Sequence, residues 1–310
     1  MSTSDTRPVV VGVDGVPGSA GALRYGIAEA RRRGTALHLV HVLPSYPPVW
    51  PTVPVAPAAL TRIGAGILER AADEVHRAAP DLVVTTSLGH GSRSAAIVGA
   101  ARAAQLVVVG RETRHGVDRV LTGTTTAGVA ARASCDVVVV PSSWMPGCPH
   151  GRVVVGVKTS RNARELLSRA FAEARAHGAE LVVVTAWELP DPYLDRIELR
   201  THSADWEADG RRVLHELLAD WRADYPDVPV DIRIAHGRPA EVLQRASADS
   251  DLLLVSRRRH TIPPYGRLGG VPHALLRLCE APVEVVPYVD HREPGPVADP
   301  VLEAAGAPLT

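Results

Sequence analysis

The chain carries the same pattern of residues twice, and this duplication limits the folds open to it more than any other feature. The sequence Val-Val-Val-Gly-Val at residues 9–13 recurs at residues 153–157, and Ala-Glu-Ala-Arg at residues 28–31 recurs at residues 172–175. Later matches follow in the same order, down to a Val-Pro pair that closes the last strand of each copy. A period of about 145 residues indicates two copies of one domain, because the units of solenoid proteins run about 20–50 residues.

Length and charge agree with two ordinary globular domains. The 310 residues suffice for two cores of normal size, and 34 Lys and Arg residues balance 34 Asp and Glu residues. Domains that bind nucleic acid usually carry a basic excess, so no nucleic-acid partner is expected. Three cysteines are too few for a disulfide framework, and no apolar stretch approaches the roughly 20 residues of a membrane span. We therefore expect a cytoplasmic protein with no membrane partner.

The order of apolar segments predicts the fold class. Residues 9–13 form a short, unbroken, β-branched run, which is typical of a strand buried on both faces of a parallel sheet. Such runs alternate with helical patterns through each copy, in the order β-α-β-α-β-α-β-α-β. We predict an α/β protein with two tandem doubly wound domains, each a five-stranded parallel sheet flanked by helices. In the second copy, one helix is expected between Trp187 and Trp221.

Composition places the domain boundaries. Domain 1 is expected at residues 1–142 and domain 2 at residues 151–289. A linker rich in Ser, Pro and Gly spans residues 143–150 between them. Residues 290–310 are rich in Pro, Ala and Gly without periodicity, which predicts a disordered tail.

Candidate site residues follow the strands of the first copy. Ligands of such sheets bind beyond the carboxyl ends of the strands, at the topological switch point. Asp14 follows the first strand, where its carboxylate could accept hydrogen bonds from ribose hydroxyls or serve a turn. Gly110 ends the fourth strand, either for close approach of a ligand or as a turn glycine. Gly123, Thr124 and Thr125 open a helix whose amides could bind phosphate, or they simply cap it.

Together these residues resemble the universal stress protein family, and the resemblance covers both copies almost end to end. The nucleotide-binding members of that family carry the motif G-x2-G-x9-G-[ST] after the fourth strand. In this chain the register falls on Gly110, Thr113, Gly123 and Thr124, with threonine at the place of the central glycine. The Val-Gly-Val-Asp sequence at residues 11–14 and the His41-Val42 strand end are also similar to the adenosine contacts of the family.

The resemblance implies a role for each of these positions. Asp14 would bind the ribose, the backbone of Val42 would contact adenine, and Gly110 would allow close approach. Gly123 with Thr124 and Thr125 would bind the phosphates. The full set implied for the nucleotide is Val13, Asp14, Val42, Gly110, Thr113, Gly123, Thr124 and Thr125.

The second copy departs from this pattern. Lys158 stands at the position of Asp14, Ser256 at that of Gly110, and Gly269-Gly270 at that of Gly123-Thr124. The ribose carboxylate and most of the phosphate motif are therefore lost together. The expected cofactor is ATP, with or without Mg²⁺, at one site per chain at most.

Two functions remain open from the sequence. The first is a cytoplasmic stress-response regulatory protein that binds ATP or another adenine nucleotide in the N-terminal domain. The second is a ligand-free protein-interaction module in which both nucleotide sites have decayed. An enzyme is not expected, although weak ATPase activity stays open, and neither catalytic nor metal-binding residues are predicted. The resemblance also implies a regulatory protein partner, a homodimer, and association of the two copies through residues 137–140 and 283–286.

Overall fold

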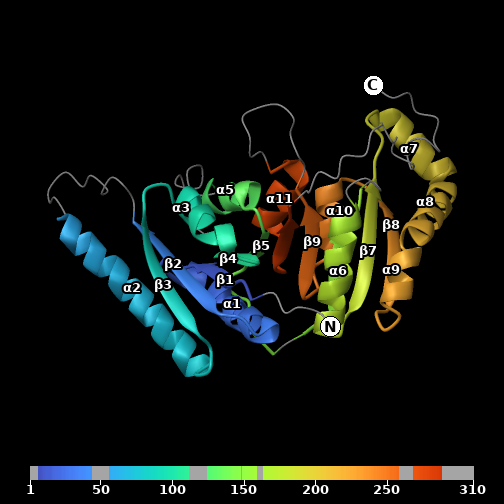
Figure 1. Cartoon of the computed structure of the whole chain (residues 1–310). Coiled ribbons are helices and arrows are strands. Elements are labelled where there is room, and N and C mark those ends of the chain that lie inside the picture. Colours follow the sequence, from blue (N-terminus) through green and yellow to red (C-terminus); the bar gives the residue numbers. More distant parts are fainter. Residues whose placement is uncertain are drawn as a thin grey trace. The chain divides into compact units, whose positions relative to one another are not determined.

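The computed structural model describes residues 6–43, 56–111, 124–147, 149–158, 163–257 and 268–287 (Figure 1). The chain divides into two compact units. Unit 1 comprises Met1–Cys148, Arg257–Gly269 and Pro282–Pro287, and unit 2 comprises Pro149–Ser256, Gly270–Ala281 and Tyr288–Thr310. The predicted tail lies outside the described residues. Among the helices of the described ranges, none is long and apolar enough to cross a membrane.

The first copy alternates strands and helices as the sequence predicts. Its elements are β1 (Val9–Gly12), the 3₁₀ turn η1 (Pro17–Ser19), α1 (Ala20–Arg33), β2 (Leu37–Leu43), α2 (Pro57–Ala78), β3 (Val84–His90), α3 (Arg93–Ala100), the 3₁₀ turn η2 (Ala101–Ala103), β4 (Leu106–Gly110), α5 (Thr124–Arg132) and β5 (Asp136–Val140). These five strands are parallel in the order β3-β2-β1-β4-β5. The chain therefore leaves β1 toward one edge of the sheet and returns to β4 on its other side, which makes β1/β4 the switch point.

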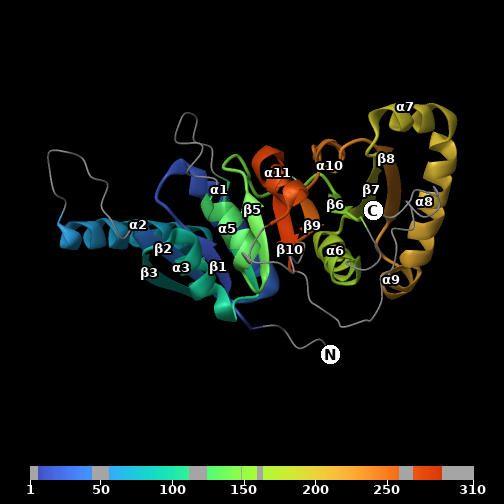
Figure 2. The same ribbon diagram turned by 90° about the horizontal axis from the view of Figure 1, so that it is seen from above.

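Both faces of this sheet are covered by helices, which explains the unbroken apolar runs. Successive strand residues point to opposite faces. Val11 meets α1 at Gly26, whereas a side chain at Gly12 would meet Ile97 of α3. α1 packs on β1 and β4, α2 packs on β2 and β3, and α3 packs against α5 (Figures 1 and 2). The three valines of β1, Val9, Val10 and Val11, are completely buried as a result.

The second copy repeats the architecture. Its elements are β6 (Arg152–Gly156), α6 (Ala163–His177), β7 (Glu180–Trp187), α7 (Pro192–Thr201), α8 (Ser203–Leu217), α9 (Ala219–Asp224), β8 (Val230–His236), α10 (Pro239–Ala246), β9 (Leu252–Ser256), α11 (Gly270–Leu278) and β10 (Val283–Val286). In unit 2 the strands β9, β6, β7 and β8 are parallel neighbours in that order. The predicted doubly wound α/β class is confirmed in both copies.

The prediction of a single helix between Trp187 and Trp221 is wrong, because three helices occupy this stretch. The first, α7, ends where His202 leaves the helical region at φ −130°. The second, α8, ends at Leu218, after which α9 starts a new short helix. Helical periodicity continues through both breaks, so the apolar pattern alone could not locate them.

The last strands of the two copies pair with each other, as expected from the resemblance. β10 runs antiparallel to β5, with Val283 opposite Val139 and Val285 opposite Val137. These hydrogen bonds are the reason that Pro282–Pro287 belongs to unit 1. Arg257 adds a second tie within unit 1, since its guanidinium donates to the carbonyl of Ala130 at 3.2 Å, near the C-terminus of α5.

The residues after β5 are held against α1. The guanidinium of Arg24 donates to the carbonyl of Trp144 at 3.0 Å and to that of Ser142 at 2.9 Å. The rings of Tyr25 and Trp144 lie 5.0 Å apart in an edge-to-face arrangement. The first part of the predicted linker is therefore a fixed element of unit 1.

The two described cysteines are buried thiols. Burial raises the pKa of Cys135 to about 11, which keeps the thiol protonated at neutral pH. Cys279, at the equivalent place before the last strand, lies 3.5 Å from the hydroxyl of Ser247. Both act as small core residues rather than as nucleophiles, because the thiolate is the reactive form.

Replacing Gly21 by alanine tests the contact between α1 and the residues after β5. The added methyl group would overlap the carbonyl oxygen of Pro141, so the backbone must shift. We expect a loss of stability on the order of 1–3 kcal/mol, seen as a lower melting temperature in calorimetry. The matched control is Gly99→Ala in α3, where no atom lies within 4 Å of the new methyl group. That variant should be neutral or gain about 0.5–1 kcal/mol. Equal shifts in both variants would contradict the close approach.

His38 predicts a pH dependence of stability. Burial lowers the pKa of this imidazole below 6.5, and its two nitrogens lie 2.8 and 2.9 Å from the hydroxyls of Thr85 and Ser87. As the pH falls, the unfolded chain takes up the proton first, so stability present above pH 6.5 is lost toward the folded-state pKa. Between about pH 8 and pH 5, the melting temperature should fall more in the natural chain than in His38→Gln. The same slope in both proteins would show that His38 does not contribute.

Candidate functional site

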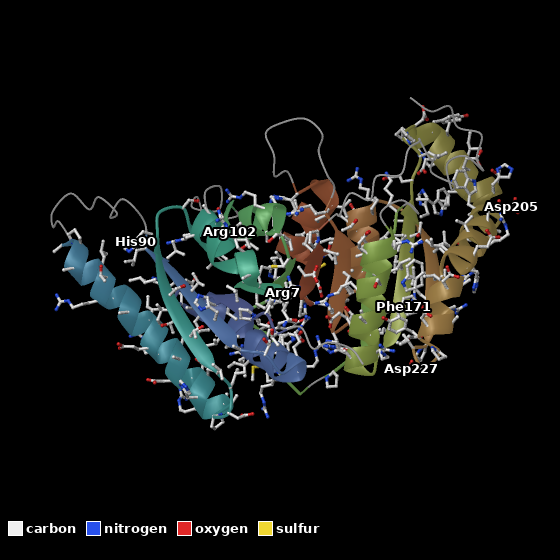
Figure 3. The ribbon with its side chains drawn as sticks, viewed as in Figure 1. Arg7, His90, Arg102, Phe171, Asp205 and Asp227 are labelled. Atoms are coloured by element: carbon white, nitrogen blue, oxygen red, sulfur yellow. The ribbon has the colours of Figure 1, made fainter. Side chains whose placement is uncertain are left out.

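The candidate site lies in unit 1, at the carboxyl ends of the strands around the switch point. Asp14 follows β1, Gly110 is the last residue of β4, and α5 starts at Thr124. Figure 3 shows His90, the last residue of β3, at this same edge of the sheet. The predicted residues Thr113 and Gly123 lie outside the described residues.

Asp14 shapes the turn that follows β1. One of its carboxylate oxygens accepts a hydrogen bond from the amide of Val16 at 3.1 Å. The hydroxyl of Ser19 donates to the carbonyl of Val16 at 3.1 Å and accepts from the amide of Asp14 at 3.4 Å. Within the described residues, the second carboxylate oxygen of Asp14 makes no hydrogen bond, and the side chain is exposed. The turn role of Asp14 is therefore met with one oxygen, and an acceptor remains for a ligand.

Ser19 does not cap α1, although its position suggests this role. Its backbone is already helical, at φ −88° and ψ −7°, and its side chain makes no capping hydrogen bond. A capping residue needs an extended backbone to reach the first amides of the helix. Its hydroxyl instead closes the turn between Asp14 and α1.

Gly110 is required by the chain itself. A side chain at this position would lie 2.5 Å from the carbonyl oxygen of Gly18 and 3.2 Å from the Cα atom of Ser19. The close approach predicted for a ligand is thus already made by η1 on the end of β4. The hydroxyl of Thr126 lies 3.4 Å from the carbonyl oxygen of Gly110, which ties the first turn of α5 to the same point. The turn after β1, the end of β4 and the start of α5 are held together.

Val13 and Val42 lie at the ends of the neighbouring strands β1 and β2. The amide of Val13 donates to the carbonyl of Val40 at 2.9 Å. The carbonyl of Val13 accepts from Nδ1 of the buried His41 at 2.8 Å. Because a carbonyl can only accept, this bond places the imidazole proton on Nδ1. From the sequence, His41 is named only together with Val42, as a strand end, and its hold on the carbonyl of Val13 is not predicted. The signal for this role is the polar residue Thr185 at the equivalent position of the second copy.

The start of α5 presents the amides of its first turn to the end of β4. The first four amides of a helix have no acceptor inside it, and they carry the positive end of its dipole. α5 begins with Thr124, and Thr125 in its first turn is half-buried. Thr126 completes the run of threonines that opens this helix, and its hydroxyl lies beside the carbonyl of Gly110. The start of α5 therefore brings the amides of its first turn and the Thr126 hydroxyl to the end of β4.

The second copy keeps the backbone of this site but not its chemistry. The amide of Val157 donates to Val184 at 2.9 Å, and the hydroxyl of Thr185 donates to the carbonyl of Val157 at 3.0 Å. These bonds repeat those of Val13 with a threonine in place of His41. Lys158, at the position of Asp14, is exposed, and an ammonium group can only donate hydrogen bonds. No ribose acceptor stands at this place.

The end of β7 and the start of α11 also differ from the equivalent elements of the first copy, the end of β2 and the start of α5. Trp187, the last residue of β7, stacks on Trp206 with ring centroids 5.0 Å apart. This indole pair fills the strand end that Val42 and its neighbour occupy in the first copy. α11 begins at Gly270 and has Pro272 in its first turn, which lacks an amide hydrogen. The positions that the family resemblance assigns to adenine and to phosphate are therefore both altered in the second copy.

Comparison with known proteins identifies the family. A family model described as universal stress protein family matches residues 6–141 and 150–287. A universal stress protein of Mycobacterium tuberculosis is 30% identical over 292 residues, covering 89% of this chain and 96% of its own. A second one from the same organism is 29% identical over 307 residues, covering 92% of this chain and 96% of its own. The crystal structure of a universal stress protein from Archaeoglobus fulgidus shares the fold, with a TM-score of 0.70, 17% identity, and coverage of 93% of this chain and 98% of its own.

The two matched segments correspond to the two copies seen in the sequence, and together they span most of the chain. The predicted resemblance is therefore confirmed, and the chain belongs to the universal stress protein family as two tandem copies of its domain.

Proposed function

We propose that the first copy binds an adenine nucleotide, with ATP as the first ligand to test, and that the protein is a cytoplasmic stress-response regulator. The observation that carries this proposal is Asp14. Its carboxylate is fixed by the turn through one oxygen and keeps the other for a ligand, beside Gly110 at the switch point. A carboxylate in that place is suited to accept hydrogen bonds from the hydroxyls of a ribose.

Adenine nucleotides occur in other members of the family. One universal stress protein has been solved in complex with cAMP, and one from Arabidopsis thaliana has been solved with AMP bound. These are properties of those two proteins. For this chain, support comes from its own residues at the ends of β2, β1 and β4.

The order of these strands matches the order of groups in a nucleotide. Val42 lies on β2, Asp14 follows β1, and Gly110 ends β4 beside the start of α5. Because β1 lies between β2 and β4, the three positions follow one another across the sheet. Neighbouring strands lie about 4.8 Å apart, so β2 and β4 are separated by about 10 Å. Base, ribose and phosphates can therefore lie across the three strand ends in that order.

The proposal includes one site per chain and no turnover. In the second copy, Lys158 replaces the ribose acceptor, and Pro272 removes an amide from the start of α11. A nucleotide would act by favouring one conformation over another. The segment between Asp14 and Gly21 is placed to pass on such a shift, because it touches Gly110 on one side and Pro141 on the other.

Titration calorimetry of ATP into the full chain, with and without Mg²⁺, tests the proposal. Asp14→Asn is the sharp variant, because its amide oxygen can still accept from Val16 while the negative charge is lost. We expect binding near one site per chain, weakened about 10- to 100-fold in this variant, since hydrogen bonds to charged groups contribute about 1.5–3 kcal/mol. Lys158→Gln, at the equivalent place in the second copy, is the control and should bind as the natural chain does.

Each other outcome of this titration has a distinct meaning. Two sites per chain, with one lost in Lys158→Gln, would show that the second copy binds as well. No binding of ATP, AMP or cAMP at millimolar concentration would contradict the proposal. It would then favour the ligand-free interaction module.

The variant Thr113→Gly also distinguishes a nucleotide site from a ligand-free interaction module, because it restores a residue of the family motif instead of removing one. Thr113 stands where nucleotide-binding members carry glycine, and a side chain there restricts the backbone close to the phosphates. We expect the affinity for ATP to rise several-fold in this variant, measured by the same titration. An unchanged, negligible affinity in both proteins would show that the site has decayed.

A further inference from the structure

Helix α7 exposes its apolar side chains and buries its acidic ones. Tyr193 is 70% exposed, Leu194 53% and Ile197 39%, whereas Asp195 is only 8% exposed. Tyr193 and Ile197 are four residues apart and so lie on one side of the helix. A surface helix normally turns such a stripe toward the core and its charges toward water. In α7 this arrangement is reversed.

Polar bonds hold α7 on unit 2. Asp195 lies 2.8 Å from Nε2 of His236, the last residue of β8, and it accepts from the amide of Leu189 at 2.8 Å. Burial alone would raise the pKa of Asp195, but the hydrogen bonds from Leu189 and His236 hold it below its usual value. Glu198 accepts from Nε1 of Trp206 at 3.3 Å. The inner face of α7 is therefore fixed by its carboxylates.

The space beneath α7 is already filled by aromatic rings. Trp187 stacks on Trp206 with an interplanar angle of 15°, and the ring of His236 meets Trp187 edge-on at 4.6 Å. Trp187 is 5% exposed. Aromatic rings therefore occupy this part of unit 2, whereas Tyr193, Leu194 and Ile197 of α7 stay exposed. A grouped apolar surface that the fold does not need is a mark of an interface.

The outer face of α7 is also positively charged. Arg196 and Arg200 are both exposed, and Arg200 follows Tyr193 and Ile197 on the same side of the helix. The acidic residues of this segment are used elsewhere, since Asp191 accepts from the amides of α7 at 2.8 and 2.9 Å. The surface offered is therefore bulky, apolar and cationic.

The first half of α8 has the opposite character. Ala204 and Ala208 are exposed and four residues apart, so they lie on one side of α8. Because their side chains are small, this side of the helix leaves space for larger side chains of a partner. Asp205, Glu207 and Asp209 are exposed around these alanines (Figure 3 labels Asp205 on α8). In the part of the chain that the structure describes, Asp205 and Glu207 form no ion pair. One unit thus carries two adjacent helices whose surfaces complement each other in size and charge.

We propose that α7 and α8 form the contact surface of a homodimer, with α7 of each copy packed on α8 of the other. In a twofold dimer the same patch serves both chains, so two complementary surfaces on one chain produce two equivalent contacts. Tyr193 and Ile197 would fill the space over the alanines. Arg196 and Arg200 would face Asp205 and Glu207. This inference is independent of nucleotide binding.

Size and charge favour a second copy over other occupants. A ten-residue helix is only about 15 Å long, too small for the roughly 800 Å² per partner of a stable interface. The reciprocal contact with α8 doubles the area. An anionic membrane would attract α7 but repel the acidic half of α8. An unrelated acidic helix would satisfy α7 and leave the carboxylates of α8 unpaired.

Sedimentation velocity of the full chain over a range of concentrations tests the surface. We expect a monomer–dimer equilibrium, with the dissociation constant raised at least tenfold by Ile197→Asp, as for a central interface residue. The control is Ile63→Asp on α2, a residue that is also exposed, at 57%, but lies in unit 1. It should leave the equilibrium unchanged. A chain that stays monomeric at about 100 μM, or an Ile197→Asp variant that dimerises normally, would overturn the proposal.

A charge exchange tests the pairing itself. One variant carries Arg196→Glu with Arg200→Glu, and the other carries Asp205→Arg with Glu207→Arg. Each alone should dimerise at least tenfold more weakly, because like charges then meet at both contacts. An equimolar mixture should restore the dimer as a heterodimer, since both contacts again join opposite charges. The melting temperature and circular dichroism of each variant establish that it is folded.

Two results of this exchange would overturn the proposal. Failure of the folded variants to combine would show that α7 does not face α8. Binding of the natural chain to vesicles with anionic lipids, lost on Arg196→Glu with Arg200→Glu and without any dimer, would assign the face to a membrane.

Discussion

The organisation of the first copy depends on a close approach of two backbone segments at Gly110. Only a residue without a side chain lets the turn before α1 rest on the end of β4, 2.5 Å from where a Cβ atom would lie. That contact fixes how closely the turn packs on β4, and the turn orients the Asp14 carboxylate through its hydrogen bond with Val16. A second close approach, between Gly21 and Pro141, ties the start of α1 to the residues after β5. The turn that carries Asp14 and the residues directly after β5 are thus held against the same helix within unit 1.

Duplication has preserved backbone geometry while side chains have changed. The carbonyl that ends the first strand accepts a hydrogen bond in both copies, from His41 in one and from Thr185 in the other. An imidazole and a hydroxyl share little except the ability to donate, so donation is the feature that the fold requires. Asp14 and Lys158 follow these carbonyls, and their side chains take no part in the hydrogen bonds of the sheet. The charge at this position can therefore reverse without disturbing the sheet, although Asp14 also holds the turn of the first copy through Val16.

The sequence predicts most of the fold because the strands are nearly uniform apolar runs and the copies check each other. It places the strands of both copies, whereas the pairing of β5 with β10 is an expectation that comes from the family resemblance and that the structure confirms. It does not find the breaks within 188–221, since the apolar spacing continues through His202 and only local backbone angles reveal them. For the site, the place of Asp14 after the first strand suggests a ligand-binding carboxylate. It does not reveal the hydrogen bond from Val16, which occupies one oxygen and leaves the other available. The position of Ser19 before α1 suggests a helix cap that the structure does not show, because capping depends on a backbone angle that residue type does not fix. The roles of Thr113 and Gly123 stay predictions.

The end of β7 explains how the two copies came to differ in more than one property. Trp187 stands beside the position equivalent to Val42, which the family resemblance assigns to an adenine contact in the first copy. The indole of Trp187 stacks on Trp206 and meets the ring of His236, which in turn binds Asp195 of α7. Helix α7 attaches through Asp195 and His236 and turns its own apolar residues outward. The end of β7 therefore bears on both proposals, because the equivalent strand end of the first copy would contact the nucleotide, whereas in the second copy it supports the helix that would form the dimer contact.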